Sequence, residues 1–267
     1  RYEGSFRNAL HHGKGVMTAP NGYVYDGQWV NGVKEGTAKI TYPDKSVYEG
    51  RVADGERDGF GKLTMPDGLI YEGTWREGQI DGEGKLIQPN GDVYEGGFAD
   101  DLRHGAGEFT GADGFRYEGE WVEGRIEGQG RATYADGTVH EGAFVAGAPE
   151  GPGTVRYADG STFTGSWLGG RIQGEGTAVY ANGARYEGGF SDGKYDGSGR
   201  LEYPDGYVYD GDWAAGVQHG QGTTTFPDGS VYSGGFVDGL RDGVGRIEMP
   251  DGFIYEGGWK EGEIHGE

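Results

Sequence analysis

The stretch that decides the fold is residues 71–84, YEGTWREGQIDGEG, a pattern that recurs along the chain every 23 residues. The copies start, without insertion or deletion, at Tyr2, Tyr25, Tyr48, Tyr71, Tyr94, Tyr117, His140, Phe163, Tyr186, Tyr209, Tyr232 and Tyr255. Counting from these residues as position 1, positions 3 and 12 are Gly in every copy. A fixed period of this length predicts a repeat protein, in which each copy packs against its neighbours. We therefore expect one continuous array over residues 1–267, with eleven full repeats and a truncated twelfth.

Each copy is predicted to form a β-hairpin, because two segments of alternating side chains are separated by turn residues. We expect the first strand at positions 22 to 6, as in residues 23–30, and the second at positions 12 to 18, as in residues 59–65. Residues 31–33 represent the first connection. Pro-Asp-Gly at residues 66–68 represents the second, where Pro sets φ and Gly supplies a positive φ. The expected fold is all-β: an elongated, twisted, single-layer antiparallel β-hairpin array without a globular core.

The alternation also predicts a register. Positions 1, 3, 5, 12, 14, 16 and 18 share one face of the sheet, since alternate residues of a strand point the same way. If paired positions sum to 17, the large residue at position 5 faces Gly at position 12, and positions 2 and 15 meet on the opposite face. Five such pairs carry opposite charges, and one is like-charged: Asp26 with Lys39, Glu49 with Lys62, Glu72 with Lys85, Glu118 with Arg131, Glu187 with Arg200, and Glu95 with Glu108. We thus predict one aromatic face and one charged face.

The pattern Y-x-G-x-W-x-x-G-x-x-x-G-x-G, complete in residues 71–84, resembles the MORN (membrane occupation and recognition nexus) repeat along the whole chain. The resemblance implies the same hairpin array, with a groove on the aromatic face in which partner peptides or helices bind. Position 5 is Trp in every even copy and a smaller residue in every odd copy, as in Trp29 and Val52. This alternation favours a structural unit of two hairpins, 46 residues long.

Charge and composition narrow the classes of partner. The chain holds 23 Lys and Arg against 44 Asp and Glu, a net charge of -21, which disfavours nucleic acid and anionic membranes as partners. It has no apolar run long enough to span a membrane and no cysteine. The compartment is not decided by these features, and a cytoplasmic location is favoured.

No pattern of residues indicates catalysis. The acidic residues are spread evenly by the repeat, and the Gly-x-Gly triplets lack the following helix that a phosphate site needs. Position 11 carries a column of His, Asp, Glu and Gln side chains, from His12 to His265. Such residues are ordinary in solvated turns. We therefore predict no enzymatic activity, no cofactor and no metal site.

The function expected is a protein-interaction scaffold that binds a peptide or helix, basic or amphipathic, in the aromatic groove. The candidate binding residues flank a central stretch in which His140, Pro149 and Pro152 break the pattern: they are Tyr117, Trp121, Tyr134, Tyr157, Trp167 and Tyr186. Self-association through exposed strand edges is a further expectation. Two alternatives stay open, a phospholipid-associating array and an accessory module of an enzyme whose catalytic part lies outside this chain.

Overall fold

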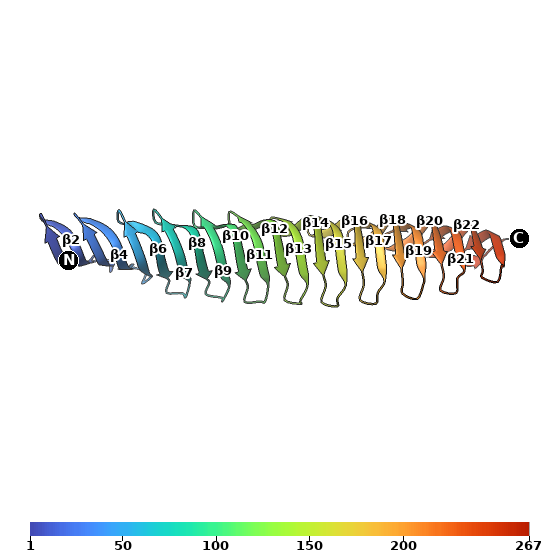
Figure 1. Cartoon of the computed structure of the whole chain (residues 1–267), viewed down its shortest axis with the longest axis horizontal. Coiled ribbons are helices and arrows are strands. Elements are labelled where there is room, and N and C mark those ends of the chain that lie inside the picture. Colours follow the sequence, from blue (N-terminus) through green and yellow to red (C-terminus); the bar gives the residue numbers. More distant parts are fainter. Residues whose placement is uncertain (267) are drawn as a thin grey trace. The chain divides into compact units, whose positions relative to one another are not determined.

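The computed structural model describes residues 1–266, which divide into two compact units, Arg1–Ala135 and Asp136 onward. Each unit is a run of antiparallel hairpins that follow one another in chain order (Figure 1). The first unit contains β1 (Tyr2–Arg7), β2 (Leu10–Thr18), β3 (Val24–Val30), β4 (Val33–Thr41), β5 (Val47–Ala53), β6 (Glu56–Thr64), β7 (Ile70–Arg76), β8 (Gln79–Ile87), β9 (Val93–Ala99), β10 (Leu102–Thr110), β11 (Arg116–Val122) and β12 (Arg125–Thr133). The second contains β13 (Val139–Val145), β14 (Ala148–Arg156), β15 (Thr162–Leu168), β16 (Arg171–Val179), β17 (Arg185–Ser191), β18 (Lys194–Glu202), β19 (Val208–Ala214), β20 (Val217–Thr225), β21 (Val231–Val237), β22 (Leu240–Glu248), β23 (Ile254–Lys260) and β24 (Glu263–Ile264).

The all-β, single-layer hairpin architecture is confirmed within each unit. Residues 1–266 contain no helix, and consequently no helical segment with the length and hydropathy that crossing a membrane requires. The first turn is tighter than predicted. Asn31 and Gly32 both have positive φ, 50° and 88°, as a two-residue type I′ turn requires, so the second strand begins at position 9 rather than 12.

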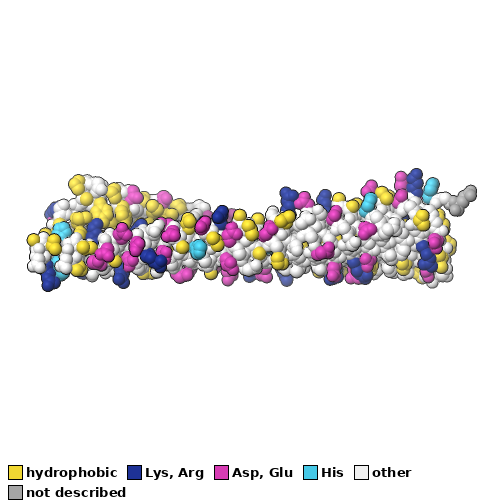
Figure 2. Space-filling model, turned by 90° about the horizontal axis from the view of Figure 1, so that it is seen from above, with side chains coloured by type: hydrophobic (Ala, Val, Ile, Leu, Met, Phe, Trp, Pro, Cys, Tyr) yellow, Lys and Arg dark blue, Asp and Glu magenta, His cyan; other side chains and the backbone are white. Residues whose placement is uncertain are grey.

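The predicted register is confirmed at positions 1 to 3. Glu72 lies opposite Lys85, and the other five predicted pairs of positions 2 and 15 are likewise partners. Within each unit, the position-15 residues also face position 2 of the next repeat, and Lys85 forms its ion pair there, 3.0 Å from Glu95. Figure 2 shows basic side chains interspersed among acidic ones on the face that it draws. Such exposed pairs stabilise by only about 0–1 kcal/mol each, so they specify register more than stability.

The predicted pairing of positions 5 and 12 within a hairpin is wrong. Trp75 lies opposite Ile80, at position 10, because a bulge between Gly73 and Trp75 places three residues of β8 against one of β7. Gly82, at position 12, takes a φ of 101° inside this bulge, a conformation that glycine tolerates. The large-against-small pairing occurs instead between repeats, where Trp75 faces Gly59 of the preceding copy.

Tyrosine and glycine together form the core of each hairpin. The Tyr71 ring is fully buried and lies over Gly73 and Gly84, where a Cβ atom on either glycine would overlap it. The Tyr71 hydroxyl donates a hydrogen bond to the Thr74 carbonyl at 2.9 Å. Most rings of position 1 therefore cover the bare glycine backbone of their own hairpin.

The same rings connect each repeat to the next. Tyr71 meets Trp75 of its own hairpin edge to face, with ring centroids 5.1 Å apart, and Phe98 of the next hairpin at 5.3 Å. The Trp75 indole Nε1 donates to the Gly61 carbonyl of the preceding repeat at 3.2 Å. Aromatic contacts thus run from repeat to repeat within each unit, and they replace a globular core.

Candidate functional site

The aromatic face is the side of each sheet that carries positions 1, 5, 10, 16, 18 and 22. Its inner layer consists of the rings at positions 1 and 5, which are almost all buried. Burial is the main cause that raises the pKa of these tyrosines, to about 12 for Tyr71 and Tyr94. Their hydroxyls donate to backbone carbonyls, so this layer supports the sheet and offers few polar groups to a ligand.

The outer layer consists of rings at positions 18 and 22, beside the second turn. Tyr134, Tyr157, Tyr180 and Tyr203 each leave between 37% and 40% of their surface exposed. Neighbouring rings touch along this layer, for example Tyr203 and Tyr207 with centroids 5.8 Å apart. These half-exposed aromatic side chains are the part of the face that a partner can reach.

Position 10 places a third kind of side chain on this face, one that is not among the candidate binding residues predicted from the sequence. Arg57, Arg103 and Arg241 lie over the tryptophan of the following repeat, with guanidinium carbons 4.0, 4.7 and 4.2 Å from the ring centroids of Trp75, Trp121 and Trp259. Each is a cation–π contact. The sequence feature that could have identified these residues is a basic residue at position 10 that is followed by a repeat with Trp at position 5.

Each unit has a pocket on its aromatic face. The pocket of the second unit has a volume of about 530 Å³ and is lined by aromatic, aliphatic and polar residues, among them Tyr195, Tyr203, Asp205, Tyr207, Trp213 and Gln218. A pocket of the first unit, about 440 Å³, is lined by Tyr42, Ser46, Arg57, Leu63 and Met65 among others. Both lie between the outer rings and position 10 of adjacent repeats.

In the first unit, the predicted binding residues lie in two layers. Tyr117 and Trp121 are buried and contact each other, with ring centroids 5.5 Å apart. Tyr134 is 37% exposed and contacts Phe115 at 5.5 Å. Of these three, Tyr134 is the one that presents its ring to solvent.

In the second unit, Tyr157 is exposed, Trp167 is half-buried and Tyr186 is fully buried. Tyr186 stacks on Tyr195, with centroids 3.6 Å apart and planes 9° from parallel. The rings of Tyr157, Trp167 and Tyr186 do not contact one another within the described residues.

Tyr117, Trp121 and Tyr186 are therefore buried candidates, with at most 4% of their surface exposed. Their burial follows from the bare glycines beneath them, which let each ring lie flat on its own sheet. A binding role for the six residues stays a prediction.

The irregular central stretch leaves buried polar atoms without partners. His140 replaces the usual tyrosine and is 2% exposed. Among residues 1–266, both of its ring nitrogens and the Trp167 Nε1 are the buried side-chain atoms that lack a hydrogen-bond partner. Burial lowers the pKa of His140, and the neighbouring Glu141 acts in the opposite direction. The two rings lie edge to face with centroids 4.8 Å apart, and neither makes the hydrogen bond to a backbone carbonyl that Tyr71 and Trp75 make.

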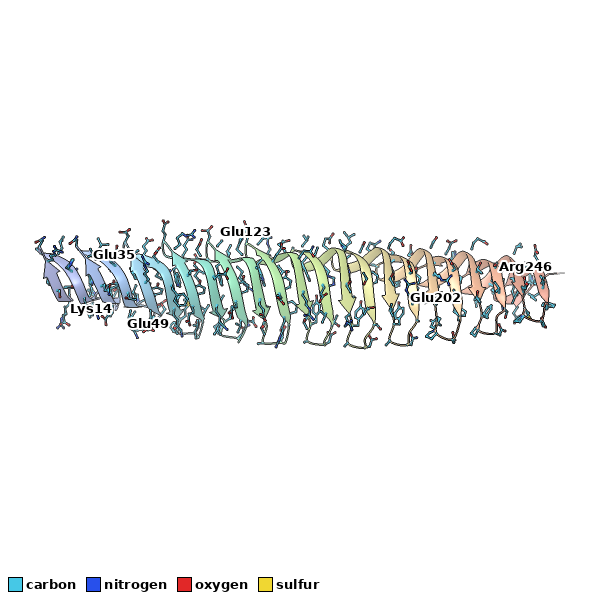
Figure 3. All side chains as sticks on the ribbon, in the orientation of Figure 1. Lys14, Glu35, Glu49, Glu123, Glu202 and Arg246 are labelled. Carbon is cyan, nitrogen blue, oxygen red and sulfur yellow. The ribbon has the colours of Figure 1, made fainter. Side chains whose placement is uncertain are left out.

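The column at position 11 has a structural role. Glu35 accepts a hydrogen bond from the Asp54 backbone nitrogen at 3.2 Å, and Gln173 accepts one from Asp192 at 3.1 Å. Figure 3 shows Glu35 at the edge of the sheet that carries the first turns. Each such acceptor satisfies a backbone donor in the first turn of the next repeat. Across residues 1–266, no three of the His, Asp and Glu side chains are grouped to hold a metal ion.

Some solved structures resemble this chain weakly. The TCP10 domain of Danio rerio CPAP is 17% identical, with 91% of this chain and 99% of that chain covered and a TM-score of 0.33. The SAS-4 TCP domain of Drosophila melanogaster, solved in complex with a proline-rich motif of Ana2, is 13% identical, with 74% and 88% covered and a TM-score of 0.33. A streptogramin B lyase is 11% identical, with 97% and 87% covered and a TM-score of 0.17. Similarity at this level does not extend to function.

No curated protein matches the chain. The family model for the MORN repeat matches nearly all of it, in twelve segments: residues 2–22, 25–47, 48–70, 71–93, 94–116, 117–139, 140–162, 163–185, 186–206, 209–231, 232–253 and 255–267. With the tyrosine, glycine and tryptophan contacts recurring from copy to copy, the chain belongs to the MORN-repeat family.

Proposed function

We propose that this chain is a non-enzymatic scaffold that binds a peptide or helix of a partner protein on its aromatic face. The observation that carries the proposal is the outer layer of half-exposed tyrosines above an inner layer that is buried and hydrogen-bonded. Tyr and Trp side chains dominate binding hot spots, because they bury a large area at a low cost in side-chain entropy. The net charge of -21 favours a basic peptide or an amphipathic helix with a basic face.

The absence of enzymatic activity is part of the proposal. The inner tyrosines have pKa values raised to about 12, far from the neutral range in which a general acid or base works best. The position-11 side chains accept hydrogen bonds from backbone turns, which gives this column of His, Asp, Glu and Gln a structural explanation.

Selection of peptides from a random display library, followed by calorimetry on the full chain, tests the proposal. Tyr134→Ser and Tyr203→Ser each remove an outer ring of the aromatic face, whereas Phe60→Ser removes a 62% exposed ring from the charged face. We expect selected peptides to bind at least about 10-fold more weakly to one of the tyrosine variants, and equally well to the Phe60 variant. If Phe60→Ser alone abolishes binding, the partner occupies the charged face and the proposal is wrong.

A further inference from the structure

The pocket of the second unit differs from the aromatic-face pocket of the first unit in the charge at position 10. In the first unit, Lys34 places its Nζ 2.9 Å from the Tyr23 hydroxyl and 4.7 Å from the centroid of that ring. Gln218 holds the same repeat position and donates from Nε2 to the Tyr207 hydroxyl at 2.8 Å. The hydrogen bond is kept, and the positive charge is lost.

The other position-10 residue of this pocket is also uncharged. Where Arg57 and Arg241 cover tryptophans in other repeats, Tyr195 lies beside Trp213 with ring centroids 5.0 Å apart. The pocket therefore gathers three tyrosine rings and a tryptophan. Its described lining contains no Lys or Arg, unlike the pocket of the first unit, which Arg57 lines.

A carboxylate lies beside these rings. Asp205 lines the pocket, and its Oδ1 accepts a hydrogen bond from the Tyr207 backbone nitrogen at 2.9 Å. Faces of aromatic rings attract cations through their quadrupoles, and a nearby carboxylate strengthens that attraction. Aromatic rings beside one carboxylate, in a pocket that no Lys or Arg lines, form a receptor for a positive charge.

We infer that this pocket binds a lysine or arginine side chain of the partner peptide, supplying from outside the cation that Lys34 and Arg57 supply within the first unit. The inference rests on the proposed function and adds to it a location and a chemical class of anchor residue. The second unit thus recognises a basic side chain.

Titration of the full ¹⁵N-labelled chain with short peptides tests the inference. The probes are Ac-Gly-Ser-Xaa-Ser-Gly-NH₂ with arginine, lysine or norleucine at Xaa, and the reporter is the indole N–H signal of Trp213, assigned with Trp213→Phe. We expect the arginine and lysine peptides to shift this signal, with affinities at least about 5-fold above that of the norleucine peptide. Their affinities should fall as salt is raised from about 20 to 200 mM, because the attraction is partly electrostatic.

Two substitutions make the test more specific, and each introduces a residue that occurs at the same repeat position elsewhere in the chain. Gln218→Lys recreates the arrangement of Lys34 and should weaken the lysine and arginine peptides at least about 5-fold, since the internal ammonium occupies the pocket. Asp205→Asn keeps the turn, because Asn21 makes the same bond to Tyr23 at 3.1 Å, and should weaken them by a similar factor. Lys34→Gln, the matched control in the first unit, should leave the Trp213 titration unchanged.

Equal binding of the norleucine peptide, or undiminished binding by folded Gln218→Lys, would overturn the inference. The inference would also be overturned if none of the three peptides shifted the indole N–H signal of Trp213. If display-selected peptides still bind more weakly to Tyr134→Ser or Tyr203→Ser, the proposed scaffold function would hold without a pocket for a cation. Selected peptides that ignore the aromatic face would contradict the proposed function itself.

Discussion

At the scale of single residues, this fold depends on glycines that would weaken an ordinary strand by about 0.5–1 kcal/mol. The loss is offset by tyrosine: the Tyr71 ring occupies the space above Gly73 and Gly84 and satisfies its hydroxyl on the Thr74 carbonyl. Repeat 2 has Ala38 at position 14, and there the bulge moves to between Gly27 and Gln28. Position 3 holds glycine in every copy.

Gly73→Ala is expected to destabilise the chain by about 1–3 kcal/mol, because its Cβ would overlap the Gly84 backbone as well as the Tyr71 ring. Urea unfolding followed by tryptophan fluorescence measures the loss. Glu72→Ala, one residue away on the charged face, is the control and should change stability by less than about 0.5 kcal/mol. Similar effects of both substitutions would refute a steric role for position 3.

His140→Tyr is expected to stabilise the chain by about 1–3 kcal/mol, because it removes two buried ring nitrogens that lack partners. The native chain should also lose stability in mild acid. Burial holds the pKa of His140 below its usual value, so below about pH 6.5 the unfolded state takes up a proton that the folded state resists.

Thermal melting of native chain and His140→Tyr at pH 7.5 and 5.5 measures both effects. The advantage of the tyrosine variant should grow as the pH falls. An advantage that is constant or shrinks would show that His140 is not held neutral by burial.

At the scale of the hairpin, the contacts suggest a unit of two repeats. Trp121 receives the Arg103 guanidinium from the preceding odd repeat and contacts Tyr94 of that repeat at 5.2 Å. The even repeats carry other residues at position 10, such as Ile80. Stability in a repeat array depends on each interface between neighbours, so the alternation should be visible when repeats are removed.

Deletion of residues 71–116 removes one even and one odd repeat, and it places Arg57 before Trp121. Deletion of residues 94–116 removes one odd repeat alone, and it places Ile80 there and sets two tryptophan repeats side by side. We expect the 46-residue deletion to melt no lower than the 23-residue deletion, although it removes twice as much chain, as scanning calorimetry can measure. A clearly higher melting temperature for the 23-residue deletion would show that the single hairpin is the independent unit.

At the scale of the whole molecule, the buried tyrosines and the excess of acidic residues recur from repeat to repeat, so their effects add along the chain. Buried tyrosine hydroxyls recur in both units, and burial raises the pKa of Tyr25, Tyr48, Tyr71, Tyr94 and Tyr117 to about 12. The acidic excess recurs likewise and gives the chain its net charge of -21. Alkaline stability and behaviour at membranes should therefore be properties of the chain as a whole.

Alkali is expected to unfold the chain cooperatively. Folded tyrosines hold their protons above the unfolded pKa of about 10, so the stability they contribute is complete below pH 10 and is lost as pH rises toward 12. Tyrosinate absorbance and far-ultraviolet circular dichroism should change together between those values. Ionisation of all tyrosines near pH 10 with an unchanged dichroism spectrum would contradict the role given to the inner rings.

Binding to anionic membranes is expected to be weak or absent at physiological ionic strength, because the charge of the chain opposes it. Flotation with vesicles that contain phosphoinositides is the measurement, with neutral phosphatidylcholine vesicles as the comparison. Robust flotation with the anionic vesicles would favour the phospholipid alternative.

The sequence by itself determined the repeat, the hairpin, the two faces and the pairing of positions 2 and 15. These features follow from period, side-chain alternation and turn residues, which are local. Only the tertiary structure decided that Trp75 pairs with Ile80 in its own hairpin and with Gly59 in the preceding one, because the bulge depends on the positive φ of Gly82. It also decided which candidate rings are accessible. Tyr117 and Tyr134 lie on the same face, yet the packing of neighbouring strands buries the first and leaves the second 37% exposed.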